Sequence, residues 1–345
     1  MRRRAAPAAA RGSTSSAGRR HSPRIDADVM NEPARTKPDV TDTARREAAA
    51  RLPSRIAFLG FGLIAGSIAA ALRDAGSTAT LSAWTPDGRG PDEGLRRGLL
   101  SAAAASLEAA VEGAELVVLA GPPLAITGAL ADGAGALRVG LDPDATVTDV
   151  ASTKGRIIEL AEATRLNFVG GHPMAGREVS GVAGATATLF VDRPWVVVPT
   201  TAAREADIDR VAALAGTTGA RPIRMTAAEH DAAVAAISHL PLVAAAALVE
   251  AVAMADGAED WPLARALAAT GWSDTTRLAR GDPEMGAGIL ATNRAAVAAR
   301  LRAYRDAIDG WIEALESNAG DGAGAADAAG LRSRLEAARE ALGPR

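Results

Sequence analysis

The stretch RIAFLGFGLIAGSIAAALRDAG, residues 55–76, decides the fold of this chain of 345 residues. Arg55–Leu59 is an apolar run with the length of a buried strand, and Leu63–Ala75 has the spacing of a helix. Between them lies the pattern G-x-G-x-x-A, residues 60–65. In such a turn the first glycine allows the sharp bend, and the second lets the backbone approach a pyrophosphate at the helix N-terminus. The segment predicts a dinucleotide-binding unit, in which Ala65 and Gly66 let the helix lie close to the sheet.

Further strands follow and extend this pattern. They are expected at TATLSAW (78–84), AELVVLAG (114–121), Thr146–Val150, Trp195–Val198 and RPIRM (221–225). From Thr226 onward the pattern changes to long Ala-rich helices. We therefore predict an α/β Rossmann-type dinucleotide-binding domain over residues 54–225 and an all-α substrate and dimerisation domain over residues 226–318. Residues 319–345 are expected to form a C-terminal helix or tail.

The first 53 residues are predicted to be a disordered tail. They carry 12 Lys and Arg against 6 Asp and Glu, are rich in Ala, Arg, Ser and Pro, and show no apolar periodicity. Their Arg and Ser content is similar to that of a transit peptide, but the six acidic residues are not. The chain uses 36 Arg and only 2 Lys, as is typical of a GC-rich bacterial genome, and Met30 is a second candidate for the start.

Composition argues against several other classes of protein. A net charge of −3 points neither to nucleic acid nor to a membrane surface as a partner. Without cysteine there is no disulfide, no thiolate metal site and no cysteine nucleophile, and we expect no metal ion. The most apolar run, residues 241–255, is interrupted by Glu250, so we expect no membrane-crossing segment and a cytoplasmic protein.

The end of the second expected strand leaves the choice of cofactor open. A carboxylate at this point normally holds the ribose 2′-hydroxyl of NAD. Here Trp84 is followed by Thr85, and Asp87 lies two positions beyond the expected place. Arg89 is placed to face the 2′-phosphate of NADP. NAD is the expected cofactor, with NADP as the alternative.

Two residues after the Thr146–Val150 strand are candidates for the site. Ser152 follows the carboxyl end of the strand, where ligands of open α/β sheets bind, although it can equally cap the next helix. Lys154 is the only lysine after the tail, in a chain that otherwise uses arginine. Either this position needs a compact ammonium, or Lys154 is one remaining surface lysine.

His172 is one of only four histidines, and it stands between a glycine pair and a proline in NFVGGHPMAGREVSG, residues 167–181. Such residues are typical of a loop with special backbone geometry. We therefore expect a loop that presents the imidazole to a ligand, with a satisfied structural histidine as the alternative.

Four motifs stand in a fixed order along the chain. They are GFGLIAGS (60–67), DVASTKG (149–155), GGHPMAG (170–176) with Glu178 and Ser180-Gly181 behind it, and ISHLP (237–241) followed by GWSDTTRLARGDPEM (271–285). Together they make the chain similar to the prephenate/arogenate dehydrogenase family of tyrosine biosynthesis, from about Arg55 to the 310s. The glycine turn is shared by many dehydrogenases, whereas the HPMAG and SDTTRLA segments are far more specific.

The resemblance implies an oxidative decarboxylation of prephenate to 4-hydroxyphenylpyruvate. A hydride leaves ring carbon C4 for the nicotinamide, and CO₂ leaves C1. The resemblance gives His172 the role of taking the C4 hydroxyl proton, with Ser152 beside it as a hydrogen-bond partner. It makes Arg277 the group that binds the ring carboxylate, and places Ser238 and Glu178 at the same pocket. The residues expected to bind the cofactor are Gly60, Phe61, Gly62, Leu63, Ile64, Thr85 and Ser152.

Departures from the family pattern leave the substrate open. Leu242 stands where many members have a second histidine, Ser273 where an arginine is frequent, and Gly286 where a tryptophan is usual. Prephenate is the expected substrate, and arogenate with NADP is the alternative. Of the other histidines, His230 is expected on a solvated helix face or in an interhelical contact, and His239 in a structural hydrogen bond.

Two readings from other classes are weaker. A non-catalytic dinucleotide sensor would not need His172, Ser152 and Arg277 together. A β-hydroxyacid dehydrogenase would normally place a lysine base in the second half, which has no lysine. Since the helices from Thr226 to Glu316 are apolar on more than one face, we expect a homodimer through this part, with no nucleic-acid or membrane partner.

Overall fold

The computed structural model describes residues 40–131, 134–177, 179–254, 258–316 and 325–343. Its first part is built on an eight-stranded sheet in the order β3-β2-β1-β4-β5-β6-β7-β8. Neighbouring strands are parallel, except that β6 and β7 are antiparallel. The strands are β1 (Arg55–Leu59), β2 (Thr80–Trp84), β3 (Ala102–Ala103), β4 (Leu116–Leu119), β5 (Thr146–Asp149), β6 (Asn167–Pro173), β7 (Pro194–Pro199) and β8 (Arg221–Arg224). The predicted strands are confirmed, and β3 and β6 are additional.

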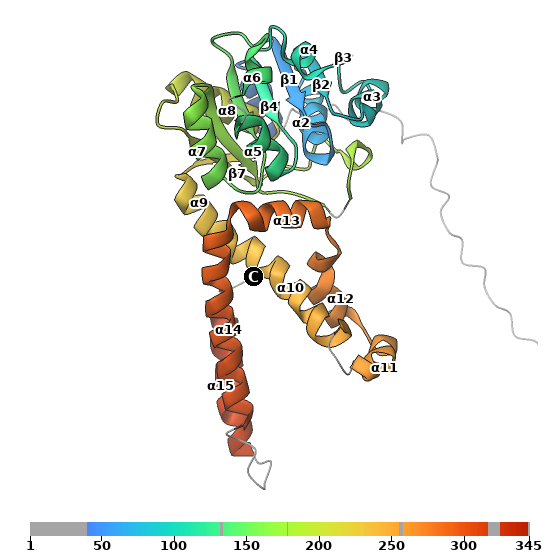
Figure 1. Ribbon diagram of the computed structural model, residues 1–345, viewed down its shortest axis with the longest axis vertical. Helices are drawn as coiled ribbons and strands as arrows, with labels where there is room; N and C mark the ends of the chain where they lie inside the picture. The colour runs from blue at the N-terminus through green and yellow to red at the C-terminus, as the bar shows by residue number, and fades with distance from the viewer. Residues whose placement is uncertain (1–39, 132–133, 178, 255–257, 317–324, 344–345) are drawn as a thin grey trace, which may run out of the picture. The chain divides into compact units, whose positions relative to one another are not determined.

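Helices cover both faces of this sheet (Figure 1). On one face, Ile56 and Phe58 of β1 pack among residues of α2 and α8, and on the other face Ala57 and Leu59 pack among residues of α4 to α7. Because β1 is covered on both sides, its four buried residues are all apolar and do not alternate with polar ones. The helices of this part are α1 (Val40–Ala49), α2 (Leu63–Asp74), α3 (Arg89–Arg96), α4 (Leu107–Val111), α5 (Pro123–Ala131), α6 (Gly135–Arg138), α7 (Gly155–Thr164), the 3₁₀ turn η1 (Val182–Gly184) and α8 (Glu205–Thr217).

The sheet changes direction at β1. The chain runs outward from β1 through β2 to β3 and then returns to the other side of β1 as β4. The carboxyl ends of β1 and β4 therefore border a crevice of the kind in which open α/β sheets bind ligands. Since β4, β5 and β6 are parallel to each other, the carboxyl ends of β5 and β6 lie along the same edge.

His172 lies in strand β6, and the expectation of a loop at this position was wrong. Its Cα is paired with that of Val196 in the antiparallel ladder with β7. In the sequence the two glycines before His172 look like a loop, but they are needed because the packing leaves no room for a side chain. A Cβ atom on Gly171 would lie 2.6 Å from the carbonyl oxygen of Asp149, and one on Gly170 would lie 3.0 Å from the side chain of Lys154. The glycine pair thus lets β6 pass close to the end of β5.

Residues 40–49 form helix α1, so the prediction of disorder for residues 1–53 was wrong in this part. Residues 1–39 lie outside the described residues. Arg45 is buried and donates to the carbonyl oxygen of Thr217 at 3.1 Å, and it forms a 3.0 Å ion pair with Asp74. Ala48 is also buried, on the same side of the helix. Helix α1 packs on the sheet part through one arginine and one alanine. Its sequence therefore has no apolar stripe from which a packed helix could be predicted.

The second part of the described chain is helical, as predicted, and its α-helices are labelled in Figure 1. It touches the sheet part in several places: α9 packs on α7 and is hydrogen-bonded to β6, and a second contact region is formed by α13 on α5. A 2.8 Å hydrogen bond between the hydroxyl groups of Thr153 and Thr292 adds to the second contact region. The elements are α9 (Ala227–Val234), the π-helical turn η2 (Ala235–His239), α10 (Leu240–Val249), the π-helical turn η3 (Glu250–Met254), the 3₁₀ turn η4 (Ala258–Asp260), α11 (Trp261–Ala266), α12 (Thr270–Thr276), the 3₁₀ turn η5 (Arg277–Arg280), α13 (Pro283–Thr292), α14 (Arg294–Glu316) and α15 (Ala325–Ala341).

The helical part leaves many apolar side chains uncovered. α9, η2, α10 and η3 form one continuous helix, Ala227–Met254, of which the most apolar window is only 22% buried. By length and composition this helix is able to cross a membrane, so the expectation that no segment is long and apolar enough was wrong. Its first residues, however, include His230 and Asp231, which are buried against the sheet part. Large side chains such as Leu263 and Leu267, 67% and 75% exposed, extend the apolar surface beyond this helix.

Candidate active site

A cavity of about 950 Å³ lies at the carboxyl ends of β1, β2 and β4, where the sheet changes direction. Of the residues expected to bind the cofactor, Gly60, Phe61, Gly62 and Thr85 line it. Leu63, Ile64 and Ser152 are not part of this lining within the described chain. From the helical part, Asp282 at the start of α13 reaches the cavity wall.

The glycine turn fits a pyrophosphate. Gly60 has φ of +96°, and a Cβ atom there would lie 2.6 Å from the backbone of Ala120, so only glycine is accommodated. At Gly62 a Cβ atom would meet nothing within 4 Å, which leaves open space at the start of α2. This helix has no side-chain cap and no acidic residue in its first turn, so its N–H groups suit an anion. Gly66, expected to approach the sheet, instead makes room for Val182 of η1.

The end of β2 carries a carboxylate that lies at the cavity. Asp87 lines the cavity together with Thr85 and Arg89. The Thr85 hydroxyl donates to Asp87 at 3.1 Å, and Arg89 donates to the other carboxylate oxygen at 2.7 Å. The hydrogen bonds from Arg89 and Thr85 lower the pKa of Asp87, so the group is a carboxylate at neutral pH. The guanidinium group of Arg89 is thus paired with the Asp87 carboxylate.

Lys154 is fully buried and paired with Asp149, so the alternative of one remaining surface lysine was wrong. Its Nζ forms an ion pair with Asp149 at the end of β5 and donates to the carbonyl of Thr153 at 3.0 Å. The Asp149 carboxylate also accepts from the backbone N–H groups of Ala151, at 2.9 Å, and Gly171, at 3.2 Å. Burial lowers the pKa of Lys154, although the adjacent Asp149 opposes this shift.

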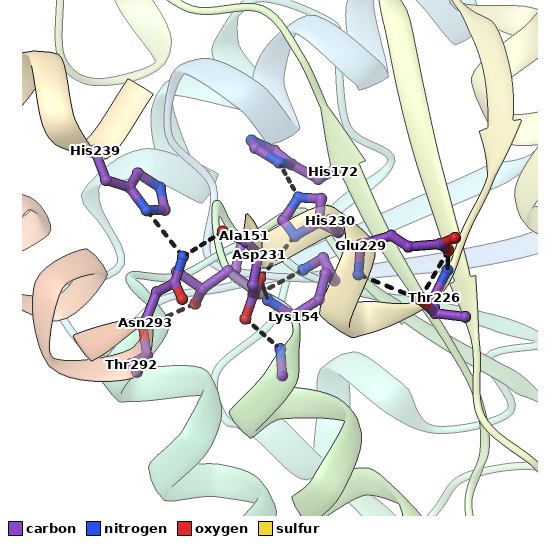
Figure 2. Close-up of polar contacts among 12 residues, drawn as sticks. Ala151, Lys154, His172, Thr226, Glu229, His230, Asp231, His239, Thr292 and Asn293 are labelled. Carbon is purple, nitrogen blue, oxygen red and sulfur yellow. Dashed lines mark hydrogen bonds and ion pairs between the residues drawn. The ribbon is translucent and has the colours of Figure 1, made fainter. Parts of the chain in front are cut away.

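A chain of hydrogen bonds leads from His172 into the helical part (Figure 2). His172 Nδ1 lies 2.8 Å from His230 Nε2, and His230 Nδ1 lies 2.7 Å from the Asp231 carboxylate. Asp231 in turn accepts from the backbone N–H groups of Lys154 and Gly155, each at 2.8 Å, where α7 begins. Asp231 therefore joins α9 to the N-terminus of α7 and, through His230, to His172.

The charges around His172 keep its ring neutral. Burial contributes most, followed by the positive charge of Lys154 and the nearby rings of His230 and His239, and together they hold the pKa of His172 well below its ordinary value of 6.5. Burial alone would raise the pKa of Asp231, but the hydrogen bonds from His230 and from the α7 N-terminus outweigh it and lower the pKa. The site thus combines a neutral imidazole with an ionised carboxylate two hydrogen bonds away, an arrangement suited to general-base chemistry.

His239 is hydrogen-bonded through Nδ1 to a residue of the helical part. Its Nδ1 lies 3.2 Å from the Asn293 amide, which also donates to the carbonyl of Asp231 at 2.9 Å. The structural hydrogen bond expected for His239 is therefore present. Its Nε2 is buried, and among the described residues no hydrogen-bond partner is found for this atom. Burial is the main cause that lowers the pKa of His239.

The other predicted site residues are placed as follows. Ser152 is half-buried after β5, and within the described residues no hydrogen bond joins it to His172, which is bonded to His230 instead. Ser238 is exposed in η2, and Arg277 is exposed at the start of η5. Glu178 lies outside the described residues.

Sequence reasoning missed His230 and Asp231 as part of the site. His230 is fully buried, so the expectation of a solvated helix face was wrong, and its ring is hydrogen-bonded to His172 of strand β6. Its neighbours in the sequence are alanines and acids, which do not show which face of the helix is buried. The usable signal was the adjacent pair of a histidine and an aspartate in a segment of otherwise small residues.

Replacing Lys154 with methionine should strongly destabilise the protein. Methionine fills similar space but leaves the Asp149 carboxylate buried without a counter-charge, and breaking a buried pair in this way typically costs about 3–5 kcal/mol. The measurement is the free energy of unfolding from urea titration. Arg156→Met, which removes an exposed partner of Glu159 on the same helix, is the control and should cost less than about 1 kcal/mol. Equal losses for the two variants would contradict the assigned role of Lys154.

Two family models match the chain. Residues 68–224 match the model described as prephenate dehydrogenase, nucleotide-binding domain, and residues 226–325 match prephenate dehydrogenase, dimerization domain. The chain is 30% identical over 269 residues to the prephenate dehydrogenase of Bacillus subtilis (strain 168), which covers 77% of this chain and 69% of that protein. It is 31% identical over 263 residues to the prephenate dehydrogenase of Lactococcus lactis subsp. cremoris (strain MG1363), with 74% and 69% covered.

Solved structures agree with this assignment. Synechocystis arogenate dehydrogenase is 31% identical, with a TM-score of 0.67 and coverage of 84% of this chain and 99% of that one. The prephenate dehydrogenase of A. aeolicus, solved with hydroxyphenyl propionate and NAD⁺, has the same fold, with a TM-score of 0.73, 24% identity and coverage of 84% and 98%. The two family models together span most of the chain. The chain therefore belongs to the prephenate dehydrogenase family and is an NAD(P)-dependent dehydrogenase.

Proposed function

We propose that this chain converts prephenate to 4-hydroxyphenylpyruvate and CO₂, with His172 as the general base. The observation that carries the proposal is the buried, neutral imidazole of His172 on the same sheet edge as the dinucleotide cavity. The relatives in Bacillus subtilis and Lactococcus lactis are both prephenate dehydrogenases.

The proposed reaction balances without any further reactant. Bound NAD supplies the nicotinamide ring that accepts the hydride from C4. His172 takes the C4 hydroxyl proton as this C–H bond breaks, and the ring becomes a ketone. The C1 carboxylate then leaves as CO₂, and its bonding electrons make the ring aromatic. His172 finally returns its proton to the phenol oxygen. An imidazole whose pKa lies below neutrality suits both proton transfers.

The ring carboxylate requires a cation, and we assign this role to Arg277. The assignment rests on the match of SDTTR, residues 273–277, to the family motif and on the bidentate fit of a guanidinium to a carboxylate. Ser152, Ser238 and Glu178 are proposed as further pocket residues on the same ground. The division into a dinucleotide domain over residues 54–225 and a helical domain over 226–318 is likewise proposed.

Arogenate is the second candidate substrate, because the chain is 31% identical to Synechocystis arogenate dehydrogenase. Prephenate and arogenate differ only in a keto or an amino group on the side chain. NAD is the proposed cofactor, since Asp87 at the cavity is a carboxylate that suits a ribose hydroxyl and repels a 2′-phosphate.

Rates with prephenate and arogenate, each with NAD and NADP, test these assignments. We expect the highest kcat/KM with prephenate and NAD. A higher value with arogenate and NADP would replace the proposed function by its alternative. Absence of turnover with all four pairs would overturn the catalytic assignment altogether.

His172→Asn and Arg277→Ala should have different kinetic effects. Asparagine is able to hydrogen-bond the substrate hydroxyl but cannot accept its proton, so kcat should fall by on the order of 10²–10⁴ with KM little changed. Arg277→Ala removes the partner of a carboxylate already present in the ground state, so KM should rise steeply with a smaller fall in kcat. Since the pKa of His172 is lowered, the acidic limb of wild-type kcat/KM should lie below pH 6.5. A change confined to KM in His172→Asn would contradict its role as the base.

We also propose a homodimer through the helical part. The match to a dimerization domain and the exposed apolar side chains of this part support it, because a soluble monomer rarely leaves so much apolar surface open. Light scattering at micromolar concentration should give twice the chain mass of 34.9 kDa. A stable particle with the mass of one chain would exclude the dimer.

A further inference from the structure

We propose that His230 and Asp231 are positioning residues that hold His172 in one tautomer, with the proton on Nδ1 and the lone pair on Nε2. In this tautomer only Nε2 is able to accept the proton of a substrate hydroxyl. The catalytic part of the inference rests on the proposed function, because it takes His172 as the base. The tautomer itself is a property of the free protein and is testable without substrate.

The geometry of the three residues forms one continuous path. The distance from His172 Nδ1 to His230 Nε2 is 2.8 Å, and that from His230 Nδ1 to Asp231 Oδ1 is 2.7 Å. The two imidazole rings meet edge to face, with centroids 5.0 Å apart and an angle of 73° between their planes. His172, His230 and Asp231 are 9%, 0% and 8% exposed, so water does not compete for these hydrogen bonds. Figure 2 shows the path from His172 through His230 to Asp231.

The direction of the protons follows from Asp231. Its carboxylate faces two backbone donors, the N–H groups of Lys154 and Gly155. Since these belong to the N-terminus of α7, the helix dipole also favours a negative charge there. An ionised carboxylate only accepts hydrogen bonds, so His230 Nδ1 must carry a proton and donate it.

The second ring nitrogen of His230, Nε2, faces His172 Nδ1. With its Nδ1 protonated, a neutral His230 has an acceptor at Nε2, and His172 must therefore donate from Nδ1. The charge of Asp231 is already stabilised by α7, so a second proton on His230 is not needed to balance it. His172 Nε2 is then left as the lone-pair site. The charged and titratable groups around His172 are Lys154, His230 and His239, with Asp231 behind His230 and Asp149 beside Lys154.

The same logic operates in the Ser-His-Asp triad, where an aspartate fixes the tautomer of the catalytic histidine and its replacement by asparagine lowers kcat by about 10⁴. Here a second histidine stands between the carboxylate and the base. Because the orienting histidine and aspartate come from α9, the helical part sets the protonation state of a base that the sheet carries.

The first test is nitrogen NMR of the full chain labelled with ¹⁵N-histidine, at pH 7.5 and without substrate. The sequence has only four histidines, His21, His172, His230 and His239, so spectra of single variants assign each ring. We expect the His172 ring to be neutral with Nδ1 protonated. A proton on Nε2, or a doubly protonated His230, would overturn the proposal whether or not the chain oxidises prephenate.

The second test compares two substitutions at His230. Glutamine is able to accept from His172 through its carbonyl and to donate to Asp231 through its amide, so it keeps the direction of the hydrogen bonds. Leucine fills space but keeps neither bond. We expect His230→Leu to lower kcat for prephenate by on the order of 10²–10⁴ with KM changed less than threefold, and His230→Gln to recover at least tenfold of this loss. Equal kcat values for the two variants would overturn the positioning role.

Glu229→Gln is the matched control. Glu229 is the neighbouring exposed residue of α9, where it forms a capping box with Thr226, and glutamine is able to maintain this box. Its kcat should stay within twofold of wild type. Circular dichroism checks that each variant is folded, and if His230→Leu does not fold, the tautomer measured by NMR on the wild type still decides the proposal. Absence of prephenate turnover by the wild type, together with the expected tautomer, would reject the proposed function and leave the tautomer assignment standing.

Discussion

The buried ion pair between Lys154 and Asp149 is the interaction on which the rest of the site depends. An ammonium group with no exposed surface is stable only when a carboxylate and further acceptors surround it, and Asp149 and the Thr153 carbonyl provide them. The same carboxylate binds the N–H group of Gly171, and so fixes β6 against the end of β5. The backbone of Lys154 binds Asp231 of α9, which brings the helical part to the same point. One charged pair thus organises two strands and a helix around His172.

This arrangement also sets the electrostatics of catalysis. A histidine exposed on a surface is partly protonated near neutral pH and is a poor base below it. At this site burial and the ammonium of Lys154 disfavour a second positive charge, so His172 stays neutral. Asp231 supplies the opposite charge at a distance of two hydrogen bonds, near enough to orient the rings but without direct contact with the base. The fold therefore separates the group that keeps the base neutral from the group that orients it.

The parts of the fold that follow from local chemistry were predictable from the sequence. The glycine turn between β1 and α2 has a backbone requirement that few residues meet, and its position between a strand and a helix was predicted correctly. The strand around His172 was not predictable in this way, because Gly170 and Gly171 are required by contacts with residues 16 to 22 positions earlier in the chain. His230 was missed for a related reason. Half of the residues of α9 are alanines, and its buried face carries a histidine and an aspartate, so only the tertiary contact with β6 identifies this face as the buried one.

The π-helical turn η2 divides the long helix Ala227–Met254 into two segments whose side chains point in different directions. Each residue of an α-helix advances the direction of its side chain by about 100°, and a π-helical turn takes up one residue more than an α-helical turn. Side chains after His239 are therefore rotated by about 100° about the helix axis, compared with their directions if α9 continued as a regular α-helix. The length before the turn buries His230 and Asp231 against the sheet part, whereas α10 has only Ala245 buried within the chain. The same continuous helix can in this way turn one face of α9 toward His172 and a different face of α10 toward a second protein surface. The residues on these two faces are therefore free to change separately in evolution.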